Sequence, residues 1–317
     1  MIDNTAIRRG PPVFRSKPDS PIDDLLRARL RLSDGANLRI KGLRIALKTV
    51  DWFSRGLSGQ TFFAINETEN ALCDLDGRIG PDLIWTLLAR NGGTKVDAIG
   101  LDNVPATGPV LIGSTHPVGT FDFLVHAACL LNHRPDLKVV ANREAERFLG
   151  ADRIIPVDLD RSDTVLSARQ TRAGMLAHLT TGGALLVFGS GKVPDMKDGY
   201  LSEPEWRTGI TRMSAAANAP IVPASPNMQN SKHYYRTRKL AQFISGGNEY
   251  IGREVASLRY VSELFAKLGG HFEVHYGPSQ KPGTQASDLK QLAEGLVPNL
   301  YVPNSKSIGA QKKTGDP

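Results

Sequence analysis

The chain has 317 residues, of which 40% are hydrophobic and 22% charged, a balance that is typical of a folded protein with a substantial core and excludes global disorder. No segment approaches the roughly 18 consecutive apolar residues of a membrane-spanning helix, and the mean hydropathy is −0.24, so an integral membrane protein is not expected. The formal net charge is +7, but aromatic residues make up only 7% and there is no block rich in Lys and Arg. Nucleic acid is therefore excluded as the expected partner.

Both ends of the chain have the composition of mobile segments. Residues 1–37 contain four prolines and no apolar core of a secretory signal, so the sequence predicts a mobile arm there, with a helical turn within 22–32. Residues 303–317 are predicted to be a disordered tail. The two cysteines, Cys73 and Cys129, are too few for a disulfide framework or a thiolate metal site, and we expect both to be small buried side chains in a reducing compartment. The expected location is the cytoplasm.

The segment from 38 to 57 has the pattern of a basic amphipathic helix. Apolar residues recur at helical spacing, and the basic residues Arg44, Lys48 and Arg55 fall on the opposite side. Residues 38–59 contain five basic residues and one acidic residue, which gives a net charge of +4. A basic helix with aromatic neighbours favours the headgroup plane of an anionic membrane, so the sequence predicts a membrane-association region over 38–80. A core helix with an ordinary solvated face is the alternative.

Helix-like and strand-like segments alternate from residue 81 onward. Strands are predicted over 110–114, 137–141, 154–157, 184–188, 220–224 and 271–276, and helices over 121–132, 162–179, 205–218 and 253–268. Such alternation favours a parallel sheet covered by helices on both faces. The predicted fold class is α/β, with a mixed, largely parallel sheet flanked by helices over 81–302 and an amphipathic helix before it.

The segment LIGSTHPVGTFDFL at 111–124 carries the strongest candidate for chemistry. A buried strand runs into a turn with His116 and Gly119, and Asp122 enters an apolar helix. Ligand sites in such sheets gather at the carboxyl ends of strands. The short spacing lets Asp122 reach one imidazole nitrogen of His116 while the other stays free as a base. The alternative is a structural histidine in a turn, with Asp122 as an ordinary residue at a helix start.

This segment resembles the catalytic block of the glycerolipid (lysophospholipid) acyltransferase superfamily. It is similar to the branch of hemolysin-like and lyso-ornithine lipid acyltransferases, whose block reads His-Pro-x-Gly-x-x-Asp. Further segments resemble the other family blocks in the same order: 101–112 the lead-in, 151–158 the second block, 182–193 the third and 219–225 the fourth. The third block departs from the family's usual Phe-Pro-x-Gly, because the proline and the acidic residue that follows are both absent from Phe188-Gly189-Ser190-Gly191-Lys192.

The resemblance implies that 81–302 is an O-acyltransferase domain that moves a fatty acyl chain from acyl-CoA or acyl carrier protein to a lysolipid hydroxyl, without a cofactor. His116 would be the general base, and Asp122 would orient it. The implied substrate-binding residues are Gly119, Arg153, Gly189, Ser190, Gly191, Lys192 and Pro223. A Gly-Ser-Gly-Lys turn after a strand can bind phosphate through backbone N–H groups and the lysine. The implied partners are the acyl donor, a lysolipid acceptor and an anionic membrane surface at the inner face of the cell membrane.

Two functions of other classes stay open. The altered third block fits a catalytically silent lipid- or phosphate-binding protein on the same fold. An acyltransferase that acts on a non-lipid hydroxyl is the second rival. Asn227, Asn230 and Ser231 resemble an Asn-Ser element of the hemolysin-like branch, and they read equally well as polar turn residues after a strand.

Metal binding is not expected, although two sets of side chains have ligand-like spacing. These are His116, Asp122 and His126 on one hand and His271, Glu273 and His275 on the other. Neither set has a second, independent signal for zinc. We therefore expect His126 to pack within its helix and the second set to form a solvated strand face.

Overall fold

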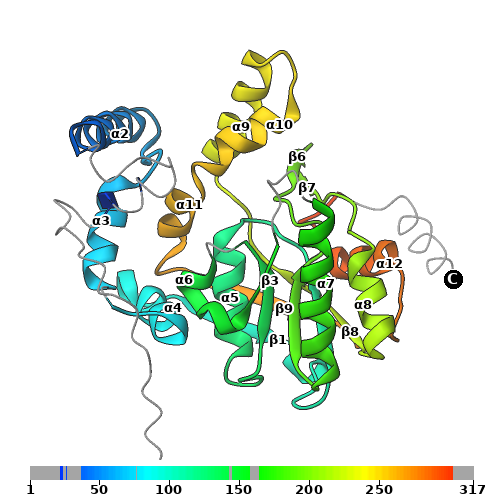
Figure 1. Ribbon diagram of the computed structural model, residues 1–317. Helices are drawn as coiled ribbons and strands as arrows, with labels where there is room; N and C mark the ends of the chain where they lie inside the picture. The colour runs from blue at the N-terminus through cyan, green and yellow to red at the C-terminus, as the bar shows by residue number, and fades with distance from the viewer. Residues whose placement is uncertain are drawn as a thin grey trace, which may run out of the picture.

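The computed structural model describes residues 22–23, 26, 37–75, 77–142, 145–157 and 164–302 (Figure 1). The arm predicted over 1–37 lies outside these residues apart from a few positions, of which Ile22, Asp23 and Leu26 are helical. The tail predicted over 303–317 lies outside them entirely, so both remain predictions. Among the described residues, no helix has the length and apolar character needed to cross a bilayer.

A seven-stranded sheet forms the centre of the molecule, in the order β1-β9-β8-β2-β5-β3-β4. Its strands are β1 (Lys95–Ile99), β2 (Val110–Ser114), β3 (Lys138–Ala141), β4 (Ile154–Pro156), β5 (Ala184–Phe188), β8 (Ile221–Pro226) and β9 (His271–Tyr276). Five neighbouring strands from β8 to β4 are parallel, whereas β9 runs antiparallel to β8 and parallel to β1. The predicted α/β class with a mixed, largely parallel sheet is confirmed. A small separate hairpin pairs β6 (Asp195–Lys197) with β7 (Tyr200–Ser202).

Helices cover both faces of this sheet. Because successive side chains of a strand point to opposite faces, Ile112 of β2 packs into a core with α4 (Gly80–Leu88) and α5 (Thr120–Leu130). Its neighbour Leu111 packs into a second core with α7 (Thr164–Thr180), α8 (Gly209–Ala217) and α12 (Ala286–Gly295). Cys129 of α5 is buried as predicted, whereas Cys73 is exposed, so the prediction of a buried thiol is wrong there.

Three helices lie between β8 and β9 in the chain, where the sequence predicted only one. They are α9 (Lys232–Ile244), α10 (Glu249–Ser257) and α11 (Tyr260–Lys267), so the helix expected over 253–268 is divided. The helix expected over 205–218 begins later, at Gly209, because Trp206 before it is buried against the sheet. A short helix α6 (Glu146–Leu149) precedes β4.

The predicted amphipathic helix is α2 (Asn37–Ser58), and its basic residues are partly paired with acidic residues of the protein, while Arg39, Lys41 and Arg55 are exposed. The three basic residues expected to meet lipid headgroups pair with acidic residues: Arg44 with Asp23 at 2.9 Å, Lys48 with Glu69 at 2.8 Å, and Arg55 with Glu67. Glu67 and Glu69 belong to α3 (Ile65–Asp74). These pairs offset part of the positive charge of the helix, although Arg55 is still 58% exposed, and the predicted membrane association of 38–80 stays a prediction.

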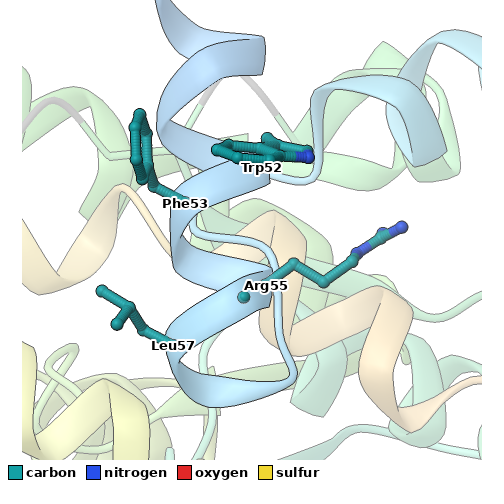
Figure 2. A pocket seen from close by; sticks show the side chains of 5 residues that line it. Trp52, Phe53, Arg55 and Leu57 are labelled. Carbon is teal, nitrogen blue, oxygen red and sulfur yellow. The ribbon is translucent and has the colours of Figure 1, made fainter.

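The opposite, apolar side of α2 is exposed. Its exposed large side chains are Leu38, Ile45, Val50, Trp52, Phe53 and Leu57. Trp52 is 72% exposed and Leu57 is 89% exposed, which is unusual for side chains of this size. Trp52, Phe53 and Leu57 line a shallow hollow on this surface (Figure 2). The helix therefore presents large apolar side chains to its surroundings, with the exposed Arg55 beside them in the same hollow.

Candidate active site

The carboxyl ends of β2, β5 and β8 meet at one edge of the sheet. Ser114 ends β2 beside Phe188, which ends β5, and the chain then enters the loop that holds His116. In a parallel sheet this edge is where ligand sites form. The predicted pair and the altered third block are therefore next to each other, as their order in the chain implied.

The His116 and Asp122 side chains meet at this edge. Nδ1 of His116 lies 2.9 Å from Oδ2 of Asp122, with its N–H direction turned away from the ideal line of a hydrogen bond. Catalytic contacts are often imperfectly aligned without substrate. The imidazole is 19% exposed, and no described residue is hydrogen-bonded to its Nε2. The geometry leaves Nε2 available to take a proton.

Two backbone groups hold the Asp122 carboxylate in place. Oδ2 accepts hydrogen bonds from the N–H groups of Val118 and Gly119, each at 2.9 Å. The side chain is fully buried, and Oδ1 has no partner among the described residues. The carboxylate therefore both ties the loop to the first turn of α5 and stands beside the imidazole.

Phe188 and Gly119 set the shape of the loop around His116. The imidazole stacks on the Phe188 ring, with centroids 4.2 Å apart and planes at 29°. Gly119 has φ +108°, a conformation that side-chain-bearing residues rarely adopt, and a Cβ there would lie 3.2 Å from the ring of Tyr260 in α11. The absence of a side chain at Gly119, one of the implied substrate-binding residues, thus allows the Tyr260 ring to pack against the loop.

Asn230 and Ser231 connect the loop to α9 and α11. Asn230 is buried and donates from Nδ2 to the carbonyl oxygen of Val118 at 3.1 Å. Ser231 caps α9 by accepting from the N–H of Tyr234, and its hydroxyl donates to Glu263 of α11 at 2.6 Å. Asn230 therefore contacts the backbone of the loop that holds His116, and Ser231 acts as a helix cap.

The third block is built differently from the phosphate-binding turn that we expected. Three of its backbone N–H groups are already bonded within the protein: Gly189 to Ser114, Gly191 to Phe188, and Lys192 to the hydroxyl of Ser190. These three donors are engaged within the protein, so the turn offers fewer backbone N–H groups to a phosphate than the sequence suggested. Ser190 is buried and donates its hydroxyl to the Lys192 carbonyl at 3.0 Å, so it stabilises the turn itself.

Gly189 is required for packing. A Cβ at this position would lie only 2.0 Å from the indole of Trp206, so the missing side chain is what allows this ring to lie against the backbone. Trp206 in turn donates from Nε1 to Glu203 at 3.2 Å. Burial raises the pKa of Glu203 to about 8, although the hydrogen bond from Trp206 and the nearby Ser190 hydroxyl oppose the shift. A carboxyl group thus lies beneath the turn after all, but it comes from a later part of the chain.

Two cations lie at the surface of the turn. Lys192 and Arg207 are both exposed. The guanidinium of Arg207 lies against Gly191, since a Cβ at that position would be 3.9 Å from it. The sequence pointed to Lys192 only. Arg207 lies outside the block in the sequence, and no local pattern could have identified it, because β6, β7 and Trp206 intervene before the chain returns to the turn.

Arg153 is not brought to the site. It precedes β4, and the strand register places it level with Leu111 and three strands away from β2. With about 3.3 Å per residue along a strand and about 4.8 Å between strands, Arg153 lies roughly 20 Å from His116. Its guanidinium donates to the carbonyl oxygen of Pro135. Pro223 lies in the buried interior of β8, level with Gly113. Neither position supports contact with a substrate at His116.

The second histidine of the segment has a structural environment. His126 is fully buried between the Ser114 hydroxyl at 2.8 Å and the Tyr276 hydroxyl at 3.1 Å. Burial, and to a smaller degree the charge of His116, lowers the pKa of His126 to about 3. His271 pairs with Asp97 on an exposed strand face. Among the described residues, no cluster of three or more His, Cys, Asp or Glu side chains has the arrangement of a metal site.

Comparison with known proteins gives little similarity. No protein-family model matches the chain, and no curated protein matches it significantly. A search of solved structures finds the 1-acyl-sn-glycerophosphate (LPA) acyltransferase PlsC of Thermotoga maritima, with 12% identity and a TM-score of 0.40, over 87% of this chain and 99% of that chain. A likeness at this level assigns neither catalytic residues nor an activity to this chain.

Proposed function

We propose that the protein is an O-acyltransferase that transfers a fatty acyl chain from a thioester to the hydroxyl group of a lysolipid. The observation that carries this proposal is the pair of His116 and Asp122 at the carboxyl edge of the sheet, with Nδ1 and Oδ2 2.9 Å apart and Nε2 available. A carboxylate beside one imidazole nitrogen fixes the tautomer in which the other nitrogen is a base. The motif around this pair also resembles the catalytic block of glycerolipid acyltransferases.

The reaction follows from these two side chains. The acceptor hydroxyl oxygen attacks the carbonyl carbon of the thioester while Nε2 of His116 accepts the hydroxyl proton. Asp122 stabilises the imidazolium that forms. The carbon–sulfur bond of the tetrahedral intermediate then breaks, and the leaving thiolate takes the proton back from His116. The products are an ester and a free thiol, and no acyl-enzyme is needed.

The acceptor headgroup is proposed to lie over the turn of the third block. With three backbone donors of that turn already engaged, Lys192 and Arg207 offer positive charge on the turn that follows Phe188, whose ring stacks on His116. Arg binds phosphate through paired N–H donors and Lys as a point charge. A lysolipid with a phosphate group, such as a lysophosphatidic acid, therefore fits better than a headgroup that has only positive charge. The thioester donor is proposed to be acyl-CoA or acyl carrier protein.

The exposed apolar side of α2 is proposed to bind a bilayer, in which both acceptor and product would reside. The peripheral attachment then depends on Trp52, Phe53 and Leu57 rather than on the paired bases of the helix. Apolar side chains of an interfacial helix enter the boundary between headgroups and acyl chains. The proposed location is the inner face of the cell membrane.

A thioester-cleavage assay tests the proposal. Purified protein is mixed with acyl-CoA or acyl carrier protein, and release of free thiol is followed with and without a lysolipid acceptor. We expect acceptor-dependent release and an acylated lipid product by mass spectrometry. Binding of lipid without thiol release from either donor would instead favour the catalytically silent lipid-binding protein, and release with a soluble alcohol alone would favour a non-lipid acceptor.

A further inference from the structure

The helical hairpin formed by α9 and α10 carries an exposed apolar tip. Figure 1 shows that it projects beyond the end of the sheet at which β8 finishes. Its exposed large side chains are Leu240 (60%), Phe243 (81%), Ile244 (75%), Tyr250 (59%) and Ile251 (40%). They gather around the turn between the two helices, on both sides of Gly246 and Gly247. Apolar surface gathered in this way on a projecting element marks an interaction site.

The hairpin is firmly built, so this exposure is a property of its folded form. α9 and α10 pack closely at Gly252, where a Cβ would lie 2.9 Å from the carbonyl oxygen of Arg238. Arg238 is buried and donates to the carbonyl oxygen of Pro194 at 2.8 Å, which ties α9 to the region of β6. Asn248 caps α10 by accepting from two backbone N–H groups. Phe243 and Ile244 are therefore held outward by a packed scaffold.

The charge around the tip identifies the partner. Residues 232–257 contain five basic and two acidic residues. Lys232, Arg236 and Lys239 are exposed, as is Glu249 beside Tyr250 at the tip. Exposed bases behind an apolar tip match an anionic bilayer, whose headgroups attract the bases while its acyl chains accept the tip. An acidic carrier protein would also attract the bases. It would cover Phe243 and Ile244 only if it offered an apolar surface of its own, whereas the acyl chains of a bilayer accept them directly.

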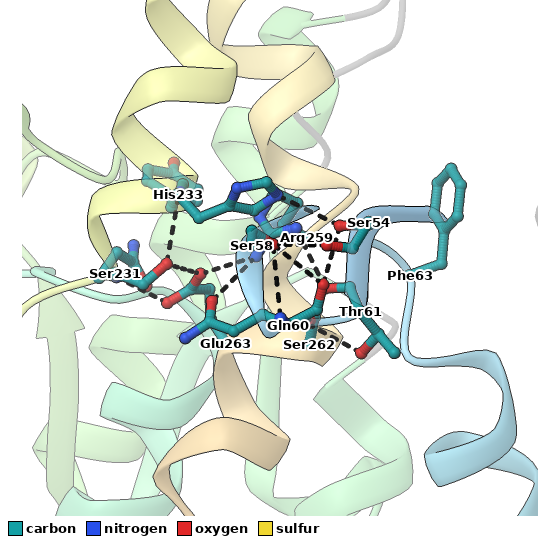
Figure 3. Close-up of polar contacts among 12 residues, drawn as sticks. Ser54, Ser58, Gln60, Thr61, Phe63, Ser231, His233, Arg259, Ser262 and Glu263 are labelled. Carbon is teal, nitrogen blue, oxygen red and sulfur yellow. Dashed lines mark hydrogen bonds and ion pairs between the residues drawn. The ribbon is translucent and has the colours of Figure 1, made fainter. Parts of the chain in front are cut away.

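The hairpin and α2 are neighbours at the base of α9. The Ser54 hydroxyl of α2 lies 3.5 Å from Nε2 of His233 in α9, and the rings of Phe62 and His233 are 6.3 Å apart, as Figure 3 shows for Ser54 and His233. α9 begins directly after Asn230, which contacts the loop of His116. The two apolar surfaces therefore flank the segment that joins α9 to the candidate active site.

From these observations, we infer that the tip of the α9–α10 hairpin is a second membrane-binding surface, separate from α2, which inserts Phe243 and Ile244 among the acyl chains of an anionic bilayer. The inference goes beyond the proposed function, because lipid binding by the hairpin requires no acyl transfer and no contribution from α2.

Fluorescence quenching by brominated lipid tests where the tip lies. In a Trp52→Phe background, Phe243→Trp places an indole at the tip, and Leu292→Trp places one on α12, where the native side chain is 41% exposed. Vesicles contain equal parts of phosphatidylglycerol and phosphatidylcholine, with or without bromine on the acyl chains. We expect bromine to quench the added emission at position 243 and to leave that at 292 unchanged. Equal emission with both vesicles at position 243, while vesicle binding persists, would overturn the inference.

A binding measurement gives the second readout. Phe243→Ser with Ile244→Ser should weaken the partition coefficient onto the same vesicles about tenfold or more, since two large apolar side chains no longer enter the bilayer, whereas Leu292→Ser should not change it. Both changes are at exposed positions, so the melting temperature should stay constant. Acyl transfer to a detergent-dispersed acceptor should also persist in the double variant, which separates this inference from the proposed function. Unchanged partition, or loss of binding to an acidic acyl carrier protein only, would contradict lipid insertion.

Discussion

Arg259, immediately before α11, forms an ion pair with Glu263 one turn into that helix, and both side chains are almost completely excluded from solvent, at 0% and 1% exposure. Glu263 also accepts from Ser231 at the start of α9 and pairs with Lys267. Arg259 donates to the carbonyl oxygen of Thr61, in the segment that follows α2. The pair therefore joins α2, α9 and α11 at one buried point (Figure 3).

Removing the carboxylate of this pair should be strongly destabilising. Glu263→Gln removes the ion-pair partner of the buried Arg259 and leaves only the more distant charge of Asp51, and the loss of a buried ion-pair partner costs about 3–5 kcal/mol. The free energy of unfolding in urea measures this. Asp82→Asn is the matched control, because it breaks the (i,i+4) pair with Arg78, whose side chains are 43% and 63% exposed, and should cost less than about 1 kcal/mol. Equal costs for the two variants would show that the buried pair does not hold the three helices together.

The candidate base is tested by substitution at His116. His116→Ala should lower acyl transfer by about 10²–10⁴-fold, the usual contribution of a general base. Asp122→Asn should also be severe, since an amide can hold the imidazole in the wrong tautomer. Asp122 also tethers two backbone N–H groups, so circular dichroism and thermal melting must accompany the kinetics. Near-native turnover of a folded His116→Ala protein would refute the mechanism.

The two cations at the third block are tested by their effect on the acceptor. Lys192→Met and Arg207→Met should each raise KM for a phosphate-bearing lysolipid more than they lower kcat, which is the pattern of lost uniform binding. The double variant should lose more than either single variant. An acceptor without phosphate should be affected less, provided that these cations do not hold the donor. A fall in kcat with constant KM on both acceptors would instead indicate stabilisation of the transition state.

The buried carboxyl beneath the turn makes stability depend on pH. The pKa of Glu203 is about 8 in the folded protein against 4.5 ordinarily, so between these values the folded state keeps a proton that the unfolded state has lost. The free energy of unfolding should therefore fall as the pH rises from about 4.5 to about 8 and then level off, by up to about 5 kcal/mol. Glu203→Gln should remove this loss, so that the variant is more stable than the wild type at pH 9 but not at pH 5. Parallel stability curves for the two proteins would contradict the assignment.

The orientation of α2 predicts which substitutions release the protein from vesicles. Trp52→Ser with Phe53→Ser should weaken binding to anionic vesicles without changing the melting temperature, because both side chains are exposed. Lys48→Glu should instead lower the melting temperature, since it opposes Glu69 of α3, and adding Glu69→Lys should restore part of the loss. Strong release by Lys48→Glu with unchanged stability would mean that this base faces lipid after all.

Short-range patterns in the sequence were enough to predict the fold class and the principal pair of the candidate site. Alternating apolar strands and helices predicted the α/β class, because each element must bury its own apolar face. The spacing from His116 to Asp122 predicted their contact, because a turn and the first residues of α5 span it without help from the rest of the chain. The resemblance to an acyltransferase block rests on the same short segment.

Contacts between residues far apart in the chain could be learned from the folded protein alone. Periodicity divided α2 into a basic and an apolar side, but only the folded chain shows that Lys48 and Arg55 pair with Glu69 and Glu67 of α3. The Gly-Ser-Gly-Lys turn resembles an anion-binding turn in the sequence. In the folded protein, three of its N–H groups donate instead to Ser114, Phe188 and Ser190. Arg207 and Glu203 reach the turn from a later segment, and such meetings follow from the packing of the whole chain, which no local pattern records.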